Sequence, residues 1–211
     1  MSDCKLVYFP VHARASFIRL LLCHANVQYV DEQLSFEEFG KRKAAGEFIN
    51  GQVPVWIQNG KQHNESKAIL RFIGAQHGYY PEDAFAAAQV DAIVDYTNDF
   101  LPKLYPDHMK KTHTDESLAN YEKVMTTVVA FYEKKLSAQG SKYLCGDKFT
   151  IADAMVGALL FAFVYNDHLD GGAKYTDCGK AIIEKHMHFS KYAALMCTEC
   201  KAFIEKYKFG F

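Results

Sequence analysis

The sequence has almost no excess charge of either sign. Its 211 residues include 24 Lys and Arg and 25 Asp and Glu, which gives a net charge of −1, and the isoelectric point is near 6.7. Proteins that bind nucleic acid or an acidic membrane surface usually present a clear basic excess. We therefore expect no nucleic acid and no membrane among the partners of this chain.

Long apolar runs are also missing. No stretch reaches the roughly 20 apolar residues that span a bilayer, and residues 1–5 lack the basic start and apolar block of a signal peptide. The composition, 49% hydrophobic and 23% charged, is that of a soluble globular protein. These features predict a cytoplasmic protein with length for one large or two small domains.

Paired cysteine motifs are scarce. Six cysteines are present, and Cys197 and Cys200 form one C-x-x-C near His186 and His188. No second C-x-x-C accompanies it, and it lies inside a helical pattern without the βαβ start of a redox motif. We expect buried or free thiols rather than a disulfide framework, and no metal site.

The most informative stretch covers residues 52–73. Val53, Val55, Trp56 and Ile57 favour a strand, but Pro54 has no N–H, so the strand begins at the proline or lies at a sheet edge. A cis Val53–Pro54 bond costs only about 0.5–1 kcal/mol and would turn the chain sharply. The backbone N–H and C=O of Val53 could then pair with an extended peptide ligand.

A turn and a helix start follow this strand. Asn59–Gly60 is a type I′ hairpin signal, and Asn64 is placed to cap a helix whose first turn contains Glu65 and Ser66. Free N–H groups and a serine hydroxyl at a helix N-terminus suit a carboxylate, and the adjacent Glu65 suits an ammonium. The stretch therefore predicts a site for the α-amino acid end of a peptide.

The elements before this stretch indicate a βαβ unit. Residues 6–9 favour a strand, residues from 15 onward an apolar helix, residues 27–30 a second strand and residues 35–45 a second helix. Such strands pair in parallel with a right-handed crossover. Because ligands bind at the carboxyl ends of the strands in α/β sheets, Tyr8 and the loop 10–14 are expected beside the peptide site.

Residues after a break at 78–83 read as helical. Asp91, Asp95 and Asp99 recur every four residues on the first long helix, which predicts an acidic row facing water or a cation. Thr150 with Asp153 forms a capping-box pattern before an apolar run at 154–165, which predicts a buried central helix. We expect two domains, residues 1–80 and residues 84–211.

Three segments together resemble the cytosolic glutathione transferases of the tyrosine type, nearest the sigma-like class. They are residues 8–19, residues 52–73 and residues 146–153. The resemblance implies an α/β thioredoxin-like N-terminal domain with a mixed four-stranded sheet, which binds glutathione. An all-α helical domain that carries the electrophile pocket would follow it, and two such chains would form a homodimer. The loop 10–13 contains neither serine nor cysteine, which favours the tyrosine type.

The resemblance also assigns roles to single residues. Tyr8 would donate a hydrogen bond to the glutathione thiolate, and Arg14 would supply a supporting positive field. Asp99 would reach the γ-glutamyl ammonium of the neighbouring subunit's glutathione. The other residues assigned to glutathione are Phe39, Lys43, Gln52, Val53, Pro54, Glu65 and Ser66. Phe39 stands where many members have tryptophan and has no donor, so Lys43 is the candidate for the glycyl carboxylate.

A second pocket would take the electrophile. It is assigned to Val11, His12, Leu101, Tyr105 and the C-terminal tail that ends at Phe211. The implied reaction is conjugation of the thiolate of reduced glutathione to hydrophobic electrophiles, as in detoxification, with glutathione as co-substrate and no further cofactor. Two alternatives stay open, which are a glutathione-dependent prostaglandin-type isomerase and a non-enzymatic binder of hydrophobic ligands on the same fold.

Overall fold

The N-terminal part of the chain forms one mixed sheet. The computed structural model describes residues 3–109, 113–169 and 172–210. Its strands are β1 (Cys4–Tyr8), β2 (Val30–Gln33), β3 (Val55–Gln58) and β4 (Lys61–His63), in the order β2-β1-β3-β4. β1 pairs with β2 in parallel, whereas β3 is antiparallel to both β1 and β4. The mixed four-stranded thioredoxin-like sheet is therefore confirmed.

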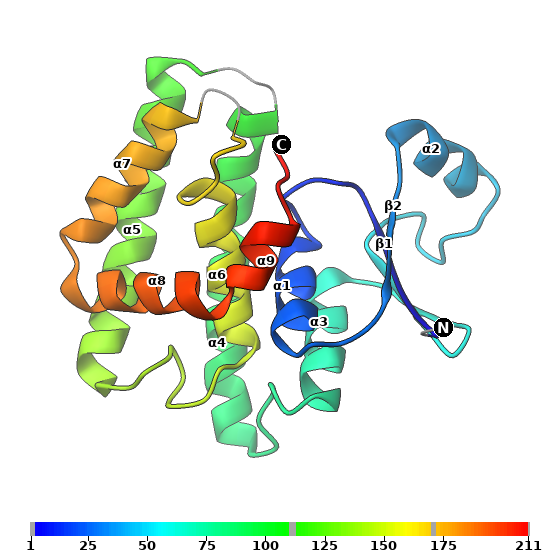
Figure 1. Ribbon diagram of the computed structural model, residues 1–211, viewed down its shortest axis with the longest axis horizontal. Helices are drawn as coiled ribbons and strands as arrows, with labels where there is room; N and C mark the ends of the chain where they lie inside the picture. The colour runs from blue at the N-terminus through cyan, green and yellow to red at the C-terminus, as the bar shows by residue number, and fades with distance from the viewer. Residues whose placement is uncertain (1–2, 110–112, 170–171, 211) are drawn as a thin grey trace.

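Three helices cover this sheet. α1 (Ser16–His24) and α3 (Ser66–Gln76) lie between the sheet and the helical part of the molecule, and α2 (Phe36–Ala44) lies on the far side (Figure 1). Under α2 a small separate core forms from Val7, Leu34, Phe48 and Val55. Tyr8, the last residue of β1, is thereby placed at the carboxyl edge of a sheet that is covered on both faces.

Two predicted strand boundaries were wrong. β1 starts at Cys4 and ends at Tyr8, and β2 starts only at Val30. The N–H of Val27 bonds to the carbonyl of Leu22 at 2.9 Å, so this residue still closes the end of α1 instead of pairing with β1. β2 is an edge strand, which explains why polar residues can occupy it.

The hairpin between β3 and β4 was predicted correctly. Asn59 and Gly60 have φ values of 50° and 73°, which a type I′ turn requires. Trp56, the single tryptophan, lies on β3 with 1% of its surface exposed. Its indole N–H donates to the side-chain oxygen of Gln58 at 3.1 Å.

After α3 the regular elements of the described chain are helices. They are α4 (Ala84–Met109), α5 (Asp115–Gln139), α6 (Ile151–Phe163), α7 (Ala173–Glu184), α8 (Met187–Glu199) and α9 (Lys201–Lys206). All residues of α6 are buried, and this helix contacts α1, α4, α7 and α8 at the centre of the molecule (Figure 1). The linker between α3 and α4 covers residues 77–83, where the sequence predicts the domain boundary.

The capping box of α6 is present as predicted. Thr150 accepts from the backbone of the first turn, and the Asp153 carboxylate accepts the N–H of Thr150 at 2.8 Å. The carboxylate also accepts the N–H of Leu144 and the hydroxyl of Tyr192, each at 3.1 Å. Asp153 is fully buried, so these bonds satisfy a group that would otherwise be costly inside the core.

All six cysteines are free thiols, as expected. Within the part of the chain that the structure describes, no group of three or more His, Cys, Asp or Glu side chains is placed to hold a metal ion. None of the helices in that part is both long and apolar enough to cross a bilayer.

Candidate active site

Tyr8 is positioned by β1 and by the loop that follows it. The side chain is 6% exposed, and its hydroxyl oxygen accepts the backbone N–H of Arg14 at 3.3 Å. Burial raises the pKa of Tyr8 above its usual value, and the Arg14 backbone bond and the charges of Arg14 and Arg19 only oppose this rise. The phenol is therefore neutral at physiological pH and can donate its proton in a hydrogen bond.

A polar pocket lies beside this loop. It is lined by Arg14, Asn50, Gln52, Val53, Pro54, Glu65 and Ser66. The Val53–Pro54 peptide bond is cis, as the sequence allowed, and the chain turns there before β3 begins. Of the residues predicted to bind glutathione, the structure brings Gln52, Val53, Pro54, Glu65 and Ser66 together in one pocket with Arg14.

The start of α3 forms one wall of the pocket. Its N-cap is Glu65 and not Asn64, so the predicted cap was wrong by one residue. Glu65 has a φ of 65°, and no side chain caps the helix. This left-handed backbone turns the chain at the position where an asparagine cap was expected, and it leaves the helix N-terminus facing the pocket.

Asn50 is a pocket residue that sequence reasoning missed. Its amide nitrogen donates to Oε1 of Glu65 at 3.2 Å, and its amide oxygen accepts the N–H of Gln52 at 3.2 Å. It thereby links the loop before the cis proline to the start of α3. Asn50 and Glu65 are 15 positions apart in sequence, so no local sequence pattern predicts their contact.

A larger apolar cavity of about 470 Å³ opens on the other side of Arg14. It is lined by Tyr8, Phe9, Val11, Ala13, Arg14, Phe36 and Tyr105. Val11 and Tyr105 were predicted for the electrophile pocket, whereas Phe9, Ala13 and Phe36 were not. Phe36 is 70% exposed and stacks on Phe9 with ring centroids 4.6 Å apart. A large exposed aromatic residue at the start of α2 is the signal that could have identified this wall.

Two predicted pocket residues lie elsewhere. His12 is 2% exposed and points away from the cavity, toward Ser16, Phe203 and Phe209. Burial lowers its pKa to about 4, so its ring is neutral at physiological pH. Leu101 is 5% exposed within the main hydrophobic core. Neither side chain lines the cavity, and Phe211 lies outside the described residues.

Comparison with protein families decides the assignment. The family model described as "Glutathione S-transferase, N-terminal domain" matches residues 2–75, and the one described as "Glutathione S-transferase, C-terminal domain" matches residues 91–198. The chain belongs to the glutathione S-transferase family.

Individual relatives agree with this transferase assignment. "Probable glutathione S-transferase 6" of Caenorhabditis elegans is 33% identical over 166 residues, covering 74% of this chain and 78% of that protein. Glutathione S-transferase 1 of Ascaris suum is 30% identical over 164 residues, with the same two coverages. The structure of monomeric Na-GST-3 from Necator americanus superposes with a TM-score of 0.80 at 27% identity, over 96% of both chains. A Pi-class glutathione S-transferase of Onchocerca volvulus shares the fold, with a TM-score of 0.80 at 21% identity over 97% of this chain and 93% of that one.

Phe39 and Lys43 of this transferase lie on α2, outside the polar pocket. The Phe39 ring packs against Phe9 and Phe48, with centroid distances of 5.3 and 5.8 Å. Lys43 is exposed and extends over the Phe39 ring, with its Nζ 5.7 Å from the centroid. Its side chain also passes beside Gly51, the residue before Gln52. Phe39 thus anchors α2 to the small core, and Lys43 is at the margin of the pocket.

The acidic row on α4 does not simply face solvent. Asp91 pairs with Arg71 at 2.7 Å, and Asp95 pairs with Lys67 at 2.7 Å. Both basic residues come from α3, so of the two predicted surroundings, water or a cation, these two aspartates have the cation. Asp99, the next in the row, is exposed.

Proposed function

We propose that this transferase conjugates the thiolate of reduced glutathione to hydrophobic electrophiles, with Tyr8 as the hydrogen-bond donor to the thiolate. One observation carries the proposal. Arg14 lines both the polar pocket and the apolar cavity, and Tyr8 is in the cavity wall. A peptide held in the polar pocket would present its cysteine side chain where the two spaces meet, beside the Tyr8 hydroxyl and an electrophile in the cavity.

The protonation state of Tyr8 suits a hydrogen-bond donor to the thiolate. A free thiol titrates near 8.5 and is mostly protonated at neutral pH. Tyr8 keeps its proton because burial raises its pKa, and its oxygen already accepts the Arg14 N–H, so the phenolic proton is available to a sulfur anion. Each unit by which that bond lowers the pKa of the thiol corresponds to about 1.4 kcal/mol of thiolate stabilisation. The Arg14 charge adds to it.

The polar pocket suits the γ-glutamyl end of glutathione. The N-terminus of α3 and the Ser66 hydroxyl would bind the carboxylate, and Glu65 would bind the ammonium. The backbone of Val53 would pair with the cysteinyl residue, beside Gln52 and Pro54. Lys43 would reach the glycyl carboxylate from the margin of the pocket. Glutathione is consumed in this scheme as a co-substrate, and no resident cofactor takes part.

The remaining features of the proposal concern assembly and class. Asp99 is exposed on α4, so in a homodimer it would be free to complete the ammonium site of the neighbouring subunit. Tyr8 and Arg14 support the tyrosine type, and we propose that the chain is nearest the sigma-like class and has a cytosolic location. The electrophile would lie against Val11, Tyr105 and the stacked rings of Phe9 and Phe36.

Conjugation of chlorodinitrobenzene, measured together with binding to immobilised glutathione, tests the proposal. Tyr8→Phe removes the donor, and we expect kcat to fall about 100-fold while glutathione binding persists. Tyr165→Phe, which removes a hydroxyl far along the chain on the helical part, is the matched control and should turn over normally. Turnover by Tyr8→Phe at the parent rate would reject the tyrosine mechanism. Binding of glutathione without conjugation by the parent protein would instead favour a ligand-binding protein.

A further inference from the structure

The described end of the chain, residues 207–210, lies against the loop that follows Tyr8. The N–H of His12 donates to the carbonyl of Gly210 at 3.3 Å, and the centroid of the His12 ring is 5.6 Å from that of Phe209. Asn166 donates to the carbonyl of Phe209 at 3.2 Å, which ties the same segment to the helical part. We expected the tail over the electrophile cavity, but its described residues are behind the loop, on the side to which His12 points.

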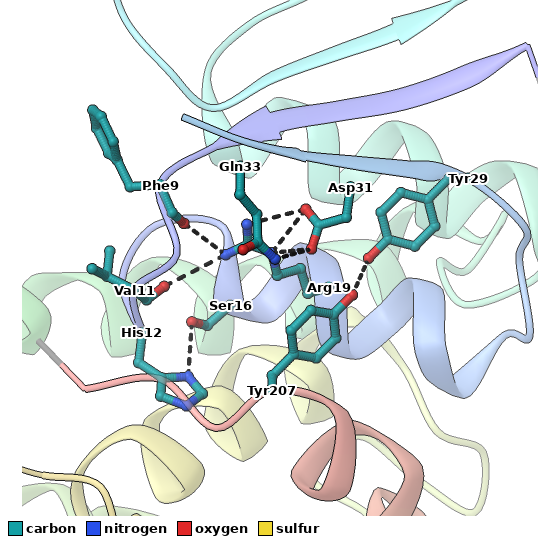
Figure 2. A network of polar contacts seen from close by, with 9 residues as sticks. All are labelled: Phe9, Val11, His12, Ser16, Arg19, Tyr29, Asp31, Gln33 and Tyr207. Atoms are coloured by element: carbon teal, nitrogen blue, oxygen red, sulfur yellow. Dashed lines mark hydrogen bonds and ion pairs between the residues drawn. The ribbon is translucent and has the colours of Figure 1, made fainter. Parts of the chain in front are cut away.

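Arg19 connects residues 207–210 to the loop that follows Tyr8. Its guanidinium is fully buried, and Nη1 donates to the carbonyl oxygens of Phe9 and Val11 at 3.1 and 3.5 Å. Nε and Nη2 donate to the carboxylate of Asp31 on β2 at 3.1–3.2 Å. Figure 2 shows the guanidinium between Asp31 on one side and the two loop carbonyls on the other. The residues directly after Tyr8 are thus fixed to β2 through one side chain.

Aromatic rings enclose the guanidinium. Its central carbon is 5.8 Å from the ring centroid of Tyr8, 5.6 Å from that of Tyr207 and 5.1 Å from that of Phe209. The hydroxyl groups of Tyr207 and Tyr29 are 2.6 Å apart, which anchors the Tyr207 ring to the segment before β2 (Figure 2). The same cation therefore touches the tyrosine in the active site and the end of the chain.

A buried ion pair contributes little net stability, because the cost of desolvating both charges offsets their attraction. A planar guanidinium does, however, impose the directions of several hydrogen bonds at once. The bonds of Arg19 fix the carbonyls of Phe9 and Val11, and the same loop places the Arg14 N–H on the Tyr8 oxygen. The arrangement is therefore better suited to holding a geometry than to stabilising the fold.

We propose that Arg19, Asp31, Tyr207, Phe209 and Gly210, together called the C-terminal buttress, position Tyr8 and Arg14 for catalysis. Arg19 and the segment do not line the polar pocket or the apolar cavity, so they act through the loop and not on substrate. The inference rests on the proposed function, in which Tyr8 donates to the thiolate. The end of the chain, although remote in sequence, then becomes a determinant of turnover.

Two buttress variants and one control test this inference in the full-length protein. Phe209→Leu removes a ring from the guanidinium and keeps an apolar side chain. Arg19→Lys keeps the charge and removes the fork of donors. Lys208→Ala, an exposed neighbour of Phe209, is the control. The measurements are kcat and the KM for glutathione, the pH dependence of thiolate absorbance of bound glutathione, and the unfolding midpoint.

We expect kcat to fall about fivefold in Phe209→Leu and about twentyfold in Arg19→Lys, because small displacements of catalytic groups are costly. The KM for glutathione should stay within twofold, since every residue lining the polar pocket except Arg14 comes from residues 50–66, and the bound thiol should titrate at higher pH. Lys208→Ala should match the parent. Parent values of kcat and of the thiol titration in folded Phe209→Leu, with only a lower unfolding midpoint, would overturn the proposal even if Arg19→Lys does not fold.

A separate readout distinguishes failure of the buttress from failure of the proposed function. Tyr8 ionisation in the free protein can be followed by NMR of ring-labelled tyrosine and assigned with Tyr8→Phe. If Tyr8→Phe turns over like the parent, the catalytic role of Tyr8 fails, and the buttress is judged on this titration alone. A shift of the Tyr8 titration in Phe209→Leu but not in Lys208→Ala supports positioning, and an unchanged titration overturns it.

Discussion

Both α3 and α6 start at a polar residue, but their N-terminal N–H groups have different surroundings. At α6, the N–H of Ile151 bonds to the carbonyl of Tyr79 at 3.0 Å, and the N–H of Ala152 bonds to the Thr150 hydroxyl at 3.3 Å. At α3, Glu65 occupies the N-cap position with a positive φ and no side chain caps the helix. The first end is buried and satisfied by the protein itself, and the second lines the polar pocket.

The difference shows how one kind of helix end can serve stability or binding. Free N–H groups at a helix start need an acceptor, which can be a capping side chain or a bound anion. In α6 the acceptors are the carbonyl of Tyr79 and the hydroxyl of Thr150, so this end stabilises the fold. In α3 the absence of a side-chain cap leaves the end available for the γ-glutamyl carboxylate in the proposed function. Substitutions at the two ends should therefore separate effects on stability from effects on glutathione binding.

The largest expected effect is on stability, from Asp153→Ala. Removal of the carboxylate leaves the buried donors of Leu144, Thr150 and Tyr192 without their acceptor, and we expect the free energy of unfolding to fall by about 4 kcal/mol. Urea unfolding of the parent and of Asp153→Ala measures this difference in the free energy of unfolding. Asp177→Ala, at an exposed position on α7, should change the free energy by no more than about 0.5 kcal/mol. Equal losses in the two variants would contradict the structural role of the α6 cap.

The pH dependence of stability sharpens the same comparison. Burial raises the pKa of Asp153 from 3.8 to about 6, so the native protein keeps this proton at pH values where the unfolded chain has lost it. The resulting stabilisation is complete below about pH 4 and is lost as the pH rises through 6. Asn cannot titrate, so the stability advantage of the parent over Asp153→Asn should shrink by roughly 3 kcal/mol between pH 4 and pH 7. A difference that stays constant across this range would disprove the raised pKa.

A substitution at the start of α3 should have a smaller effect, and it should change glutathione binding without changing stability. Ser66→Ala removes one polar contact from the proposed carboxylate site, and the KM for glutathione should rise about tenfold, which corresponds to about 1.4 kcal/mol. The free energy of unfolding should stay within about 0.5 kcal/mol of the parent. Ser137→Ala on α5 is the control and should leave both quantities unchanged. A loss of stability without a change in KM would show that the α3 end is structural, like that of α6.

Local chemistry made much of the fold predictable. The helical periodicities, the Asn59–Gly60 turn, the Thr150–Asp153 box and the option of a cis bond before Pro54 each depend on residues close in sequence, and the structure contains all of them. Side-chain partners were harder to predict. Asp91 and Asp95 were expected to face water or a cation, but the sequence does not show that the cations are Arg71 and Lys67 of α3.

The residues of the candidate site also divide into those that local sequence predicts and those that depend on the tertiary fold. The polar pocket was predicted from one continuous stretch, but Asn50 in a loop and Phe36 at the start of α2 line the two spaces at positions that no periodicity fixes. His12 was assigned to the cavity together with its neighbour Val11, and only Val11 lines it. In an irregular loop adjacent side chains can point to opposite sides, and His12 is directed toward the C-terminal segment. Arg19 looked like part of an apolar helix, and only the fold reveals its contacts with both ends of the chain.

The position of Trp56 has a consequence for experiments on unfolding. The only indole of the protein is buried in β3 of the N-terminal sheet, and the helical part contains none. Intrinsic tryptophan fluorescence therefore reports on the sheet, whereas far-ultraviolet circular dichroism is dominated by the helices that follow it. Coincident transitions of the two signals would mean that the two parts unfold as one cooperative unit. An earlier fluorescence transition would mean that the half of the molecule that carries Tyr8 opens while the helices remain folded.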